Sequence, residues 1–208
     1  MTKIILVLLC VFLLNFLFSQ SCIKHTNETT TTFLENNKPT DNAKILGKII
    51  ETKEWNDSIN LLFVFYSVSR MERAEDRQWK ITEIKGYVFI PENDSVFKRI
   101  YIDTYAQQGS IATIDTLFFT NADKDASKEL VILCKWDSKD TEGNPSKIYH
   151  AFFYDNFQYN NQTEELNVLS DFETVFGNQF EGMNKKGKLI TAKYKSIVQI
   201  NKKLKKII

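Results

Sequence analysis

Short, uninterrupted apolar segments constrain the fold of this chain more than any other feature. Residues 61–66 read Leu-Leu-Phe-Val-Phe-Tyr, and residues 130–134 read Leu-Val-Ile-Leu-Cys. A strand that alternates apolar and polar side chains has one face in water, whereas a strand that is apolar at consecutive positions is buried on both faces. We therefore expect residues 61–66 to form a strand with no solvent-exposed face, and Cys134 to be a small buried side chain.

Further strand candidates alternate with polar turns along the chain. The turns contain clusters of Asn, Asp, Gly and Pro, such as residues 91–94 and 137–145. Short strands joined by short polar connections favour an antiparallel meander over alternating βα units. Besides residues 61–66, the predicted strands are residues 87–90, 96–105, 113–120, 130–136 and 148–157.

Helical patterns are confined to the last quarter of the chain. Thr163 with two following Glu residues predicts a helix start, and Gly177 predicts its end. Ser196 and Gln199 form a capping box, and an apolar stripe follows it. The sequence therefore predicts an α+β fold, mainly an antiparallel β-sheet in a meander, with amphipathic helices near the C-terminus.

The composition limits the classes of protein to which the chain belongs. With 43% hydrophobic and 25% charged residues, it suits a globular domain rather than a disordered or fibrous chain. Its formal net charge of +1 argues against a nucleic-acid binder, which needs a basic excess to neutralise phosphates. Residues 44–208 are long enough for a single domain with its own core.

The N-terminus has the pattern of a secretory signal peptide at residues 1–21. A basic start precedes the apolar residues 4–18, which are too few to span a bilayer, and small residues follow. With Ser21 before Cys22, the segment resembles a bacterial lipoprotein signal, which implies lipidation of Cys22 and a membrane anchor. Cleavage after Gln20, giving a secreted protein, is the alternative. In that case Cys22 and Cys134 are available to form a disulfide.

Residues 22–43 are predicted to be a flexible polar tether. They contain four consecutive Thr residues and several Asn, with Phe33-Leu34 as a single apolar pair. Such a segment buries too little apolar surface to offset its ordering entropy. A tether of this kind suits a domain held away from a membrane in the cell envelope.

One loop has a pattern that suggests chemistry. Oxygen-bearing side chains alternate along residues 121–129, Asn-Ala-Asp-Lys-Asp-Ala-Ser-Lys-Glu, and converge in a tight loop, as ligands of a hard cation do. The loop and the strand after it resemble the calcium loops of FG-GAP and VCBS-type extracellular repeats. The resemblance implies a structural Ca²⁺ ion held by the side chains of Asn121, Asp123, Asp125 and Glu129 and by the backbone carbonyl of Ser127.

The loop departs from those calcium loops at two positions. Asn121 stands where the family has Asp, and Ala126 stands where it has Gly. The alternative is a solvated hairpin turn, because Asn, Asp and Ser are common turn residues.

The remaining signals leave the ligand open. The chain contains no common catalytic motif, and His150 is the one histidine of the predicted domain. The aromatic residues Phe153, Phe157 and Tyr159 share one face of a predicted strand, which is either core or, if exposed, a sugar-binding surface. We therefore expect a non-catalytic binding or structural module of the envelope, with an unknown protein or glycan ligand. The alternative is a carbohydrate-binding protein or glycoside hydrolase.

The C-terminal segment is strongly basic. Residues 185–208 contain nine Lys and no acidic side chain. Contact with anionic lipids or an acidic partner is one interpretation. Solvation of the outer face of a packed helix is the other.

Overall fold

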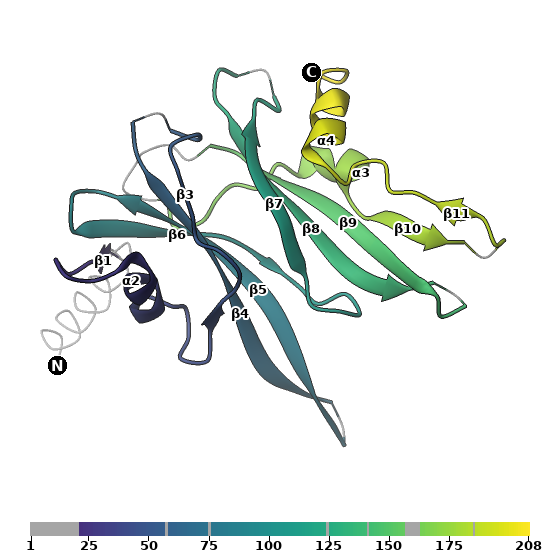
Figure 1. Ribbon diagram of the computed structural model, residues 1–208, viewed down its shortest axis with the longest axis horizontal. Helices are drawn as coiled ribbons and strands as arrows, with labels where there is room; N and C mark the ends of the chain where they lie inside the picture. The colour runs from purple at the N-terminus through teal and green to yellow at the C-terminus, as the bar shows by residue number, and fades with distance from the viewer. Residues whose placement is uncertain are drawn as a thin grey trace, which may run out of the picture.

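Two antiparallel sheets pack against each other, and each carries helical structure on its outer face (Figure 1). The computed structural model describes residues 21–56, 58–74, 76–123, 125–140, 142–156, 163–184 and 186–208. The predicted signal peptide therefore lies outside the described residues except for Ser21. Among the described residues, no helix is long and apolar enough to cross a membrane.

The first sheet is built around a three-stranded meander. Its strands lie in the order β1-β6-β5-β4-β2, and β3 also pairs with β4. The bounds are β1 Ser21–Ile23, β2 Lys44–Ile45, β3 Ile50–Thr52, β4 Leu61–Ala74, β5 Arg77–Pro91 and β6 Val96–Tyr105. The ends of β4 and β5 form a two-stranded ribbon that projects from the body of the protein (Figure 1).

The second sheet is a continuous meander in the order β11-β10-β9-β8-β7. Its bounds are β7 Thr113–Thr120, β8 Glu129–Lys139, β9 Pro145–Tyr154, β10 Gln179–Met183 and β11 Leu189–Ile190. The helical elements are α2 Thr30–Asn36, a 3₁₀ turn at Ser170–Phe172, α3 Glu173–Phe176 and α4 Ile197–Leu204. This mainly antiparallel α+β architecture confirms the predicted fold class.

The side-chain alternation of the central strands explains their continuous apolar sequences. Phe63 of β4 and Ile132 of β8 lie in the core between the two sheets. Their neighbours point the other way: Val64 packs beneath α2, and Val131 packs beneath α3 and α4. A layer therefore covers each face of both strands, as the apolar sequence of residues 61–66 predicts.

The N-terminal segment differs from the predicted tether. Strand β1 pairs with β6, and the Thr29 side chain caps α2 by accepting a hydrogen bond from the Thr32 amide. Phe33 and Leu34 are completely buried. The prediction treated this apolar pair as too small to fold, but the short helix α2 places both side chains on the sheet, where Phe33 packs against aromatic rings. Residues 21–37 are thus part of the folded body.

The predicted helix from Thr163 to Gly177 is mostly wrong. The Tyr101 amide of β6 donates to the Glu164 carbonyl, and the Leu166 amide donates to the Tyr101 carbonyl. The Leu169 amide donates to the Phe153 carbonyl of β9. These bonds hold the segment extended, and helical structure begins only at Ser170. Gly177 does end α3, and Ser196 does cap α4 by accepting a hydrogen bond from the Gln199 amide.

Candidate functional site

The 121–129 loop connects β7 to β8 within the second sheet. Thr120 and Glu129 are partners at the end of the β7–β8 ladder, so the loop closes a hairpin. Glu129 is therefore both the last residue of the loop and the first residue of a buried strand. This position takes its side chain out of water: the residue is 0% exposed.

Three acidic side chains converge in the loop. Asp123, Asp125 and Glu129 each offer one carboxylate oxygen, and these oxygens lie within 4.8 Å of one another. Two hydrogen bonds from backbone amides to side-chain carboxylates shape the turn. The Asp125 amide donates to Asp123 Oδ1 at 2.8 Å, and the Ser127 amide donates to Asp125 Oδ1 at 2.6 Å. The loop thus gathers negative charge and leaves part of it without a compensating cation among the described residues.

The Glu129 carboxylate is only half satisfied. Its Oε2 atom accepts a hydrogen bond from the Ala122 amide. Its Oε1 atom is buried and has no hydrogen-bond partner among the described residues. Burial raises the pKa of this carboxyl group, and the nearby charges of Asp123 and Asp125 raise it further, against the lowering effect of the Ala122 amide.

The other two predicted ligands are placed differently. The Asn121 side chain donates through Nδ2 to the Asp125 carbonyl at 2.5 Å, which fixes the turn. Ser127 contributes its amide to Asp125, as described above. The structure therefore brings together the three acidic members of the predicted set, while Asn121 and Ser127 shape the loop around them.

The loop also contacts the first sheet, a feature that the sequence did not indicate. The Trp55 indole, from the segment between β3 and β4, donates to the Lys128 carbonyl at 2.6 Å. Lys128 Nζ in turn donates to the Glu54 carbonyl at 3.0 Å. Trp55 packs on Phe63 and Phe119, one from each sheet. The hairpin loop is thus attached to the junction between the sheets.

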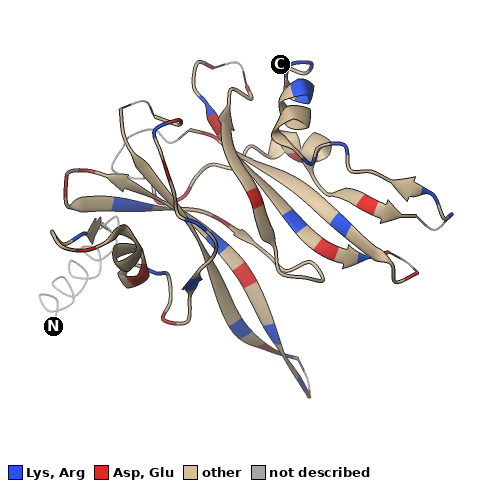
Figure 2. Cartoon of the chain, viewed as in Figure 1, with Lys and Arg blue, Asp and Glu red and all other residues tan. Residues whose placement is uncertain are grey.

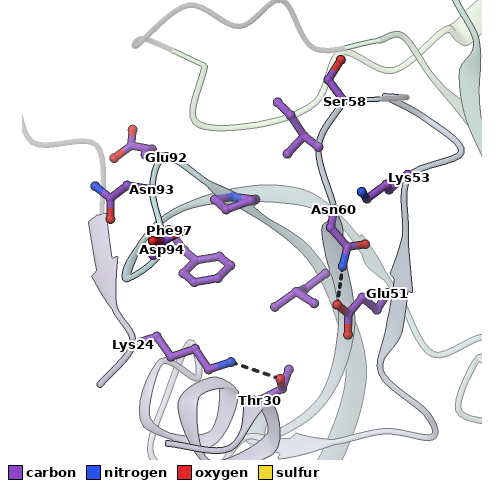
Figure 3. A pocket seen from close by; sticks show the side chains of 13 residues that line it. Lys24, Thr30, Glu51, Lys53, Ser58, Asn60, Glu92, Asn93, Asp94 and Phe97 are labelled. Atoms are coloured by element: carbon purple, nitrogen blue, oxygen red, sulfur yellow. Dashed lines mark hydrogen bonds between the residues drawn. The ribbon is translucent and has the colours of Figure 1, made fainter. Parts of the chain in front are cut away.

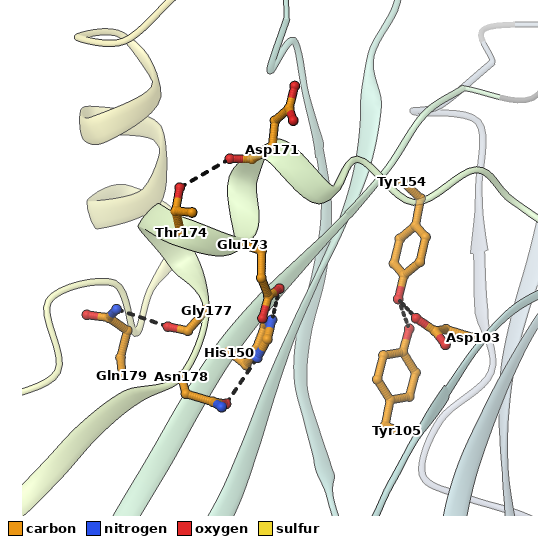
Figure 4. Close-up of polar contacts among 10 residues, drawn as sticks. All are labelled: Asp103, Tyr105, His150, Tyr154, Asp171, Glu173, Thr174, Gly177, Asn178 and Gln179. Carbon is orange, nitrogen blue, oxygen red and sulfur yellow. Dashed lines mark hydrogen bonds and ion pairs between the residues drawn. The ribbon is translucent and has the colours of Figure 1, made fainter.

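His150 forms a polar cluster that sequence reasoning missed (Figure 4). Its Nε2 lies 2.8 Å from Glu173 Oε2, and its Nδ1 lies 3.1 Å from Asn178 Oδ1. The ring stacks on Phe152 and is buried. Because both ring nitrogens are occupied, neither is available to activate a nucleophile, so this histidine serves to attach α3 to β9.

A second unpredicted cluster links the two sheets (Figure 4). The Tyr154 hydroxyl of β9 donates to Asp103 Oδ2 of β6 at 2.9 Å, and the Tyr105 hydroxyl lies 3.0 Å from the Tyr154 hydroxyl. Burial raises the pKa of both tyrosines well above the usual range. These hydroxyls therefore stay protonated and act as hydrogen-bonding groups.

A cavity of about 470 Å³ opens beside α2 (Figure 3). Leu62 and Phe97 supply apolar lining, and the polar lining includes both cations and acids, such as Lys24 and Glu92. Some of these groups already pair, because Lys24 Nζ donates to Thr30 Oγ1 at 3.3 Å. The mixed charge of this cavity selects no class of ligand.

The aromatic strand is buried as far as the structure describes it. Strand β9 ends at Tyr154, Phe153 is 2% exposed, and Phe157 and Tyr159 lie outside the described residues. Phe153 packs on Phe172 and Phe176, so it belongs to the core and offers no sugar-stacking surface.

The two described cysteines are both buried. Cys22 lies in the core beneath α2, whereas Cys134 lies in the core between the sheets. Burial raises the pKa of the Cys134 thiol well above its usual value, so it stays protonated.

Comparisons with protein-family models, curated proteins and solved structures found no match to this chain.

Proposed function

We propose that this chain is a non-catalytic binding or structural module of the bacterial cell envelope, stabilised by a Ca²⁺ ion in the 121–129 loop. The Oε1 atom of Glu129 is buried beside Asp123 and Asp125 and has no hydrogen-bond partner in the part of the chain that the structure describes; this atom carries the metal part of the proposal. A buried carboxylate oxygen without a donor is costly, and a cation supplies the missing partner.

The chemistry of the loop favours calcium over softer or smaller metals. All three side chains offer carboxylate oxygens, and the group contains no His or Cys, the ligands that zinc prefers. Ca²⁺ accepts six to eight oxygen ligands in flexible geometry, and water and backbone carbonyls commonly complete the set. Asp123, Asp125 and Glu129 would hold the ion, and the ion would neutralise their mutual repulsion.

A bound ion would act on more than the loop. It would fix the turn that presents the Lys128 carbonyl to Trp55, and Trp55 packs between the two sheets. The expected role of calcium is therefore structural: it stabilises the contact between the β7–β8 hairpin and the first sheet.

Lipidation of Cys22 remains part of the proposal, with one structural requirement. The Cys22 side chain is 5% exposed and sits beneath α2, so an acyl chain on its sulfur needs β1 to leave β6. Only three residue pairs join these strands, and β1 is the edge strand of its sheet. Detachment of β1 is therefore compatible with an intact domain.

Terbium luminescence tests the metal site directly, because Tb³⁺ replaces Ca²⁺ in oxygen sites and emits when a nearby indole is excited. Trp55 is the donor here, since it is hydrogen-bonded to the loop at Lys128. We expect sensitised emission that Ca²⁺ displaces and that Asp123→Asn and Glu129→Gln abolish. Asp140→Asn is the matched control, because Asp140 accepts loop hydrogen bonds in another turn.

Two outcomes of that titration would reject the calcium site. Emission that survives in Glu129→Gln would place the ion elsewhere, and absence of emission in the wild type would make the loop a polar turn.

The envelope part of the proposal is tested separately. Bacteria that express the full chain are labelled with an alkynyl fatty acid. Incorporation that Cys22→Ser abolishes supports the anchor, and an unlabelled, secreted product refutes it.

A further inference from the structure

The C-terminal part of the chain combines positive charge with exposed aliphatic side chains. Residues 185–208 contain nine Lys and no acid, which leaves 18 basic against 26 acidic side chains in the rest of the chain. Figure 2 shows this asymmetry: beyond the red band on β10, the described residues are drawn in blue and tan, with no red. Within this segment, Lys195 is the one described lysine that forms an ion pair, with Glu181.

Most of the exposed large hydrophobic side chains lie in this segment or at Met183, just before it. Of the twelve large hydrophobic side chains exposed in the described part of the chain, seven belong to residues 183–208: Met183, Leu189, Ile190, Ile197, Val198, Ile207 and Ile208. Val198 is 76% exposed and Leu189 is 66% exposed. Single exposed aliphatic residues are ordinary, but a concentration of them in one basic segment points to a binding surface.

Local geometry places these side chains away from the core. On α4, Ile200 and Leu204 pack into the core of the second sheet, so the opposite face of the helix carries Val198 and, one turn later, Lys202. On the β10–β11 hairpin, Met183 lies directly opposite Leu189, and paired residues share a face of the ribbon. Both elements thus present aliphatic and lysine side chains outward.

We propose that α4 and the β10–β11 hairpin form a surface that binds anionic phospholipid bilayers. Lysine ammonium groups are attracted to anionic headgroups, and aliphatic side chains beside them enter the boundary of the acyl region. A protein partner fits less well, because protein interfaces are enriched in Arg, Tyr and Trp and depleted in Lys. Every basic residue of this segment is Lys.

This surface is independent of the calcium loop and of the proposed lipid anchor. Figure 1 shows β1 at one end of the molecule and β11 at the other. A test must therefore report on the C-terminal surface itself, because the apolar residues 4–18 of the full chain also bind lipid.

An environment-sensitive fluorophore at position 198 gives that local readout. In the full chain with Cys10→Ser, a thiol-reactive nitrobenzoxadiazole dye labels Val198→Cys selectively, because Cys22 and Cys134 are buried. Met71→Cys is the matched control, since Met71 is 63% exposed on the projecting β4–β5 ribbon. The labelled proteins are titrated with vesicles of phosphatidylcholine alone or of phosphatidylcholine mixed with phosphatidylglycerol, whose anionic headgroups attract lysine side chains.

We expect blue-shifted emission at position 198 with the anionic vesicles only, and none at position 71. The double variant Lys202→Gln/Lys206→Gln should weaken the position-198 response to anionic vesicles by about 30-fold, at roughly a tenfold change per 1.4 kcal/mol. Lys48→Gln/Lys80→Gln removes the same charge from exposed sites elsewhere and should leave the response unchanged.

Three results would overturn the proposal. They are an unshifted emission at position 198, an equal shift with neutral vesicles, and an equal loss of response in the two double variants. A shift at position 198 that polyglutamate produces and anionic vesicles do not would assign the surface to an acidic protein instead.

Discussion

At the scale of single residues, Glu129 is the residue on which the proposed calcium site depends most. It begins a buried strand, yet one oxygen of its ionisable group has no hydrogen-bond partner among the residues that the structure describes. Such a group costs free energy in the metal-free protein, and neighbouring Asp123 and Asp125 add repulsion. A bound cation would remove this cost, which therefore adds to the free energy of cation binding. The stabilities of the metal-free and metal-bound proteins should accordingly differ in how they depend on pH.

The pKa of Glu129 predicts the direction of that response. Its folded-state pKa is raised above the ordinary value of 4.5, so the folded protein binds the proton more tightly than the unfolded chain. The stability that this carboxyl group contributes is therefore present below pH 4.5 and is lost as the pH rises through the raised pKa. In EDTA, the stability of the wild type relative to Glu129→Gln should fall from pH 4 to pH 7.

Urea unfolding of both proteins at several pH values measures this difference. A difference that stays constant with pH would mean that Glu129 is solvated in the folded state. Because Asp123 and Asp125 are present in both proteins, their own titration largely cancels.

The sequence predicted the acidic cluster but not what makes it a site. Alternating polar residues before an apolar strand placed Asp123, Asp125 and Glu129 in one loop. The burial of Glu129 depends on contacts that the loop sequence does not show, because β8 lies between β7 and β9 and the distant Trp55 segment contacts the loop at Lys128. Likewise, the partners of His150 are Glu173 of α3 and Asn178, two residues after the end of that helix, so no local pattern could indicate them.

At the scale of secondary-structure elements, α2 shows how little apolar surface is needed to order a segment. Thr29 supplies the cap, the Asn37 amide closes the other end, and only Phe33 and Leu34 reach the core. The helix is held further by Tyr66, whose hydroxyl donates to the Leu34 carbonyl at 2.7 Å. Composition alone classed this segment as a tether because composition does not register such specific docking.

Removal of the Phe33 ring tests this packing. Phe33→Ala should destabilise the protein by about 3–5 kcal/mol, the usual cost of deleting a fully buried aromatic side chain. Thr31→Ala, at an exposed position of the same helix, should change stability by less than about 0.5 kcal/mol. Denaturant unfolding of both variants decides the matter. If both variants change the free energy of unfolding by the same small amount, residues 22–43 form a flexible tether, as the sequence predicted.

The strands were easier to predict than the connections between them. The predicted bounds of β6 and β7 agree with the structure, because polar turns flank each apolar pattern. The extended segment after Thr163 was predicted as helix because its apolar spacing suited one. Its conformation is set instead by backbone bonds from Tyr101 and Phe153, which lie on two different sheets.

At the scale of the whole molecule, the core has three layers, and the central layer holds the two sheets together. The central layer draws side chains from β4, β5, β6 and β8. Polar links reinforce it: Trp55 bonds to the 121–129 loop, and Tyr154 of β9 bonds to Asp103 of β6. A chain of this kind has no independent half, because each sheet provides one wall of the shared core.

The two sheets should therefore unfold together. Circular dichroism reports on both sheets. The change in tryptophan fluorescence on unfolding reports on Trp55 and Trp136, which are both buried in the shared core, because Trp79 is already exposed in the folded protein. We expect the two signals to give one coincident transition in urea. Separate midpoints would show that each sheet is stable alone, and would weaken the structural role assigned to the loop.

The most direct test of the calcium site is the thermal unfolding of wild type and Glu129→Gln, each in EDTA and in millimolar Ca²⁺. The buried charge predicts that the variant is the more stable protein in EDTA. Calcium at about 100 times its dissociation constant adds about 2.7 kcal/mol to the wild type alone, so calcium raises the stability of the wild type relative to the variant. If calcium stabilises both proteins equally, or neither, then Asp123, Asp125 and Glu129 do not form a calcium site.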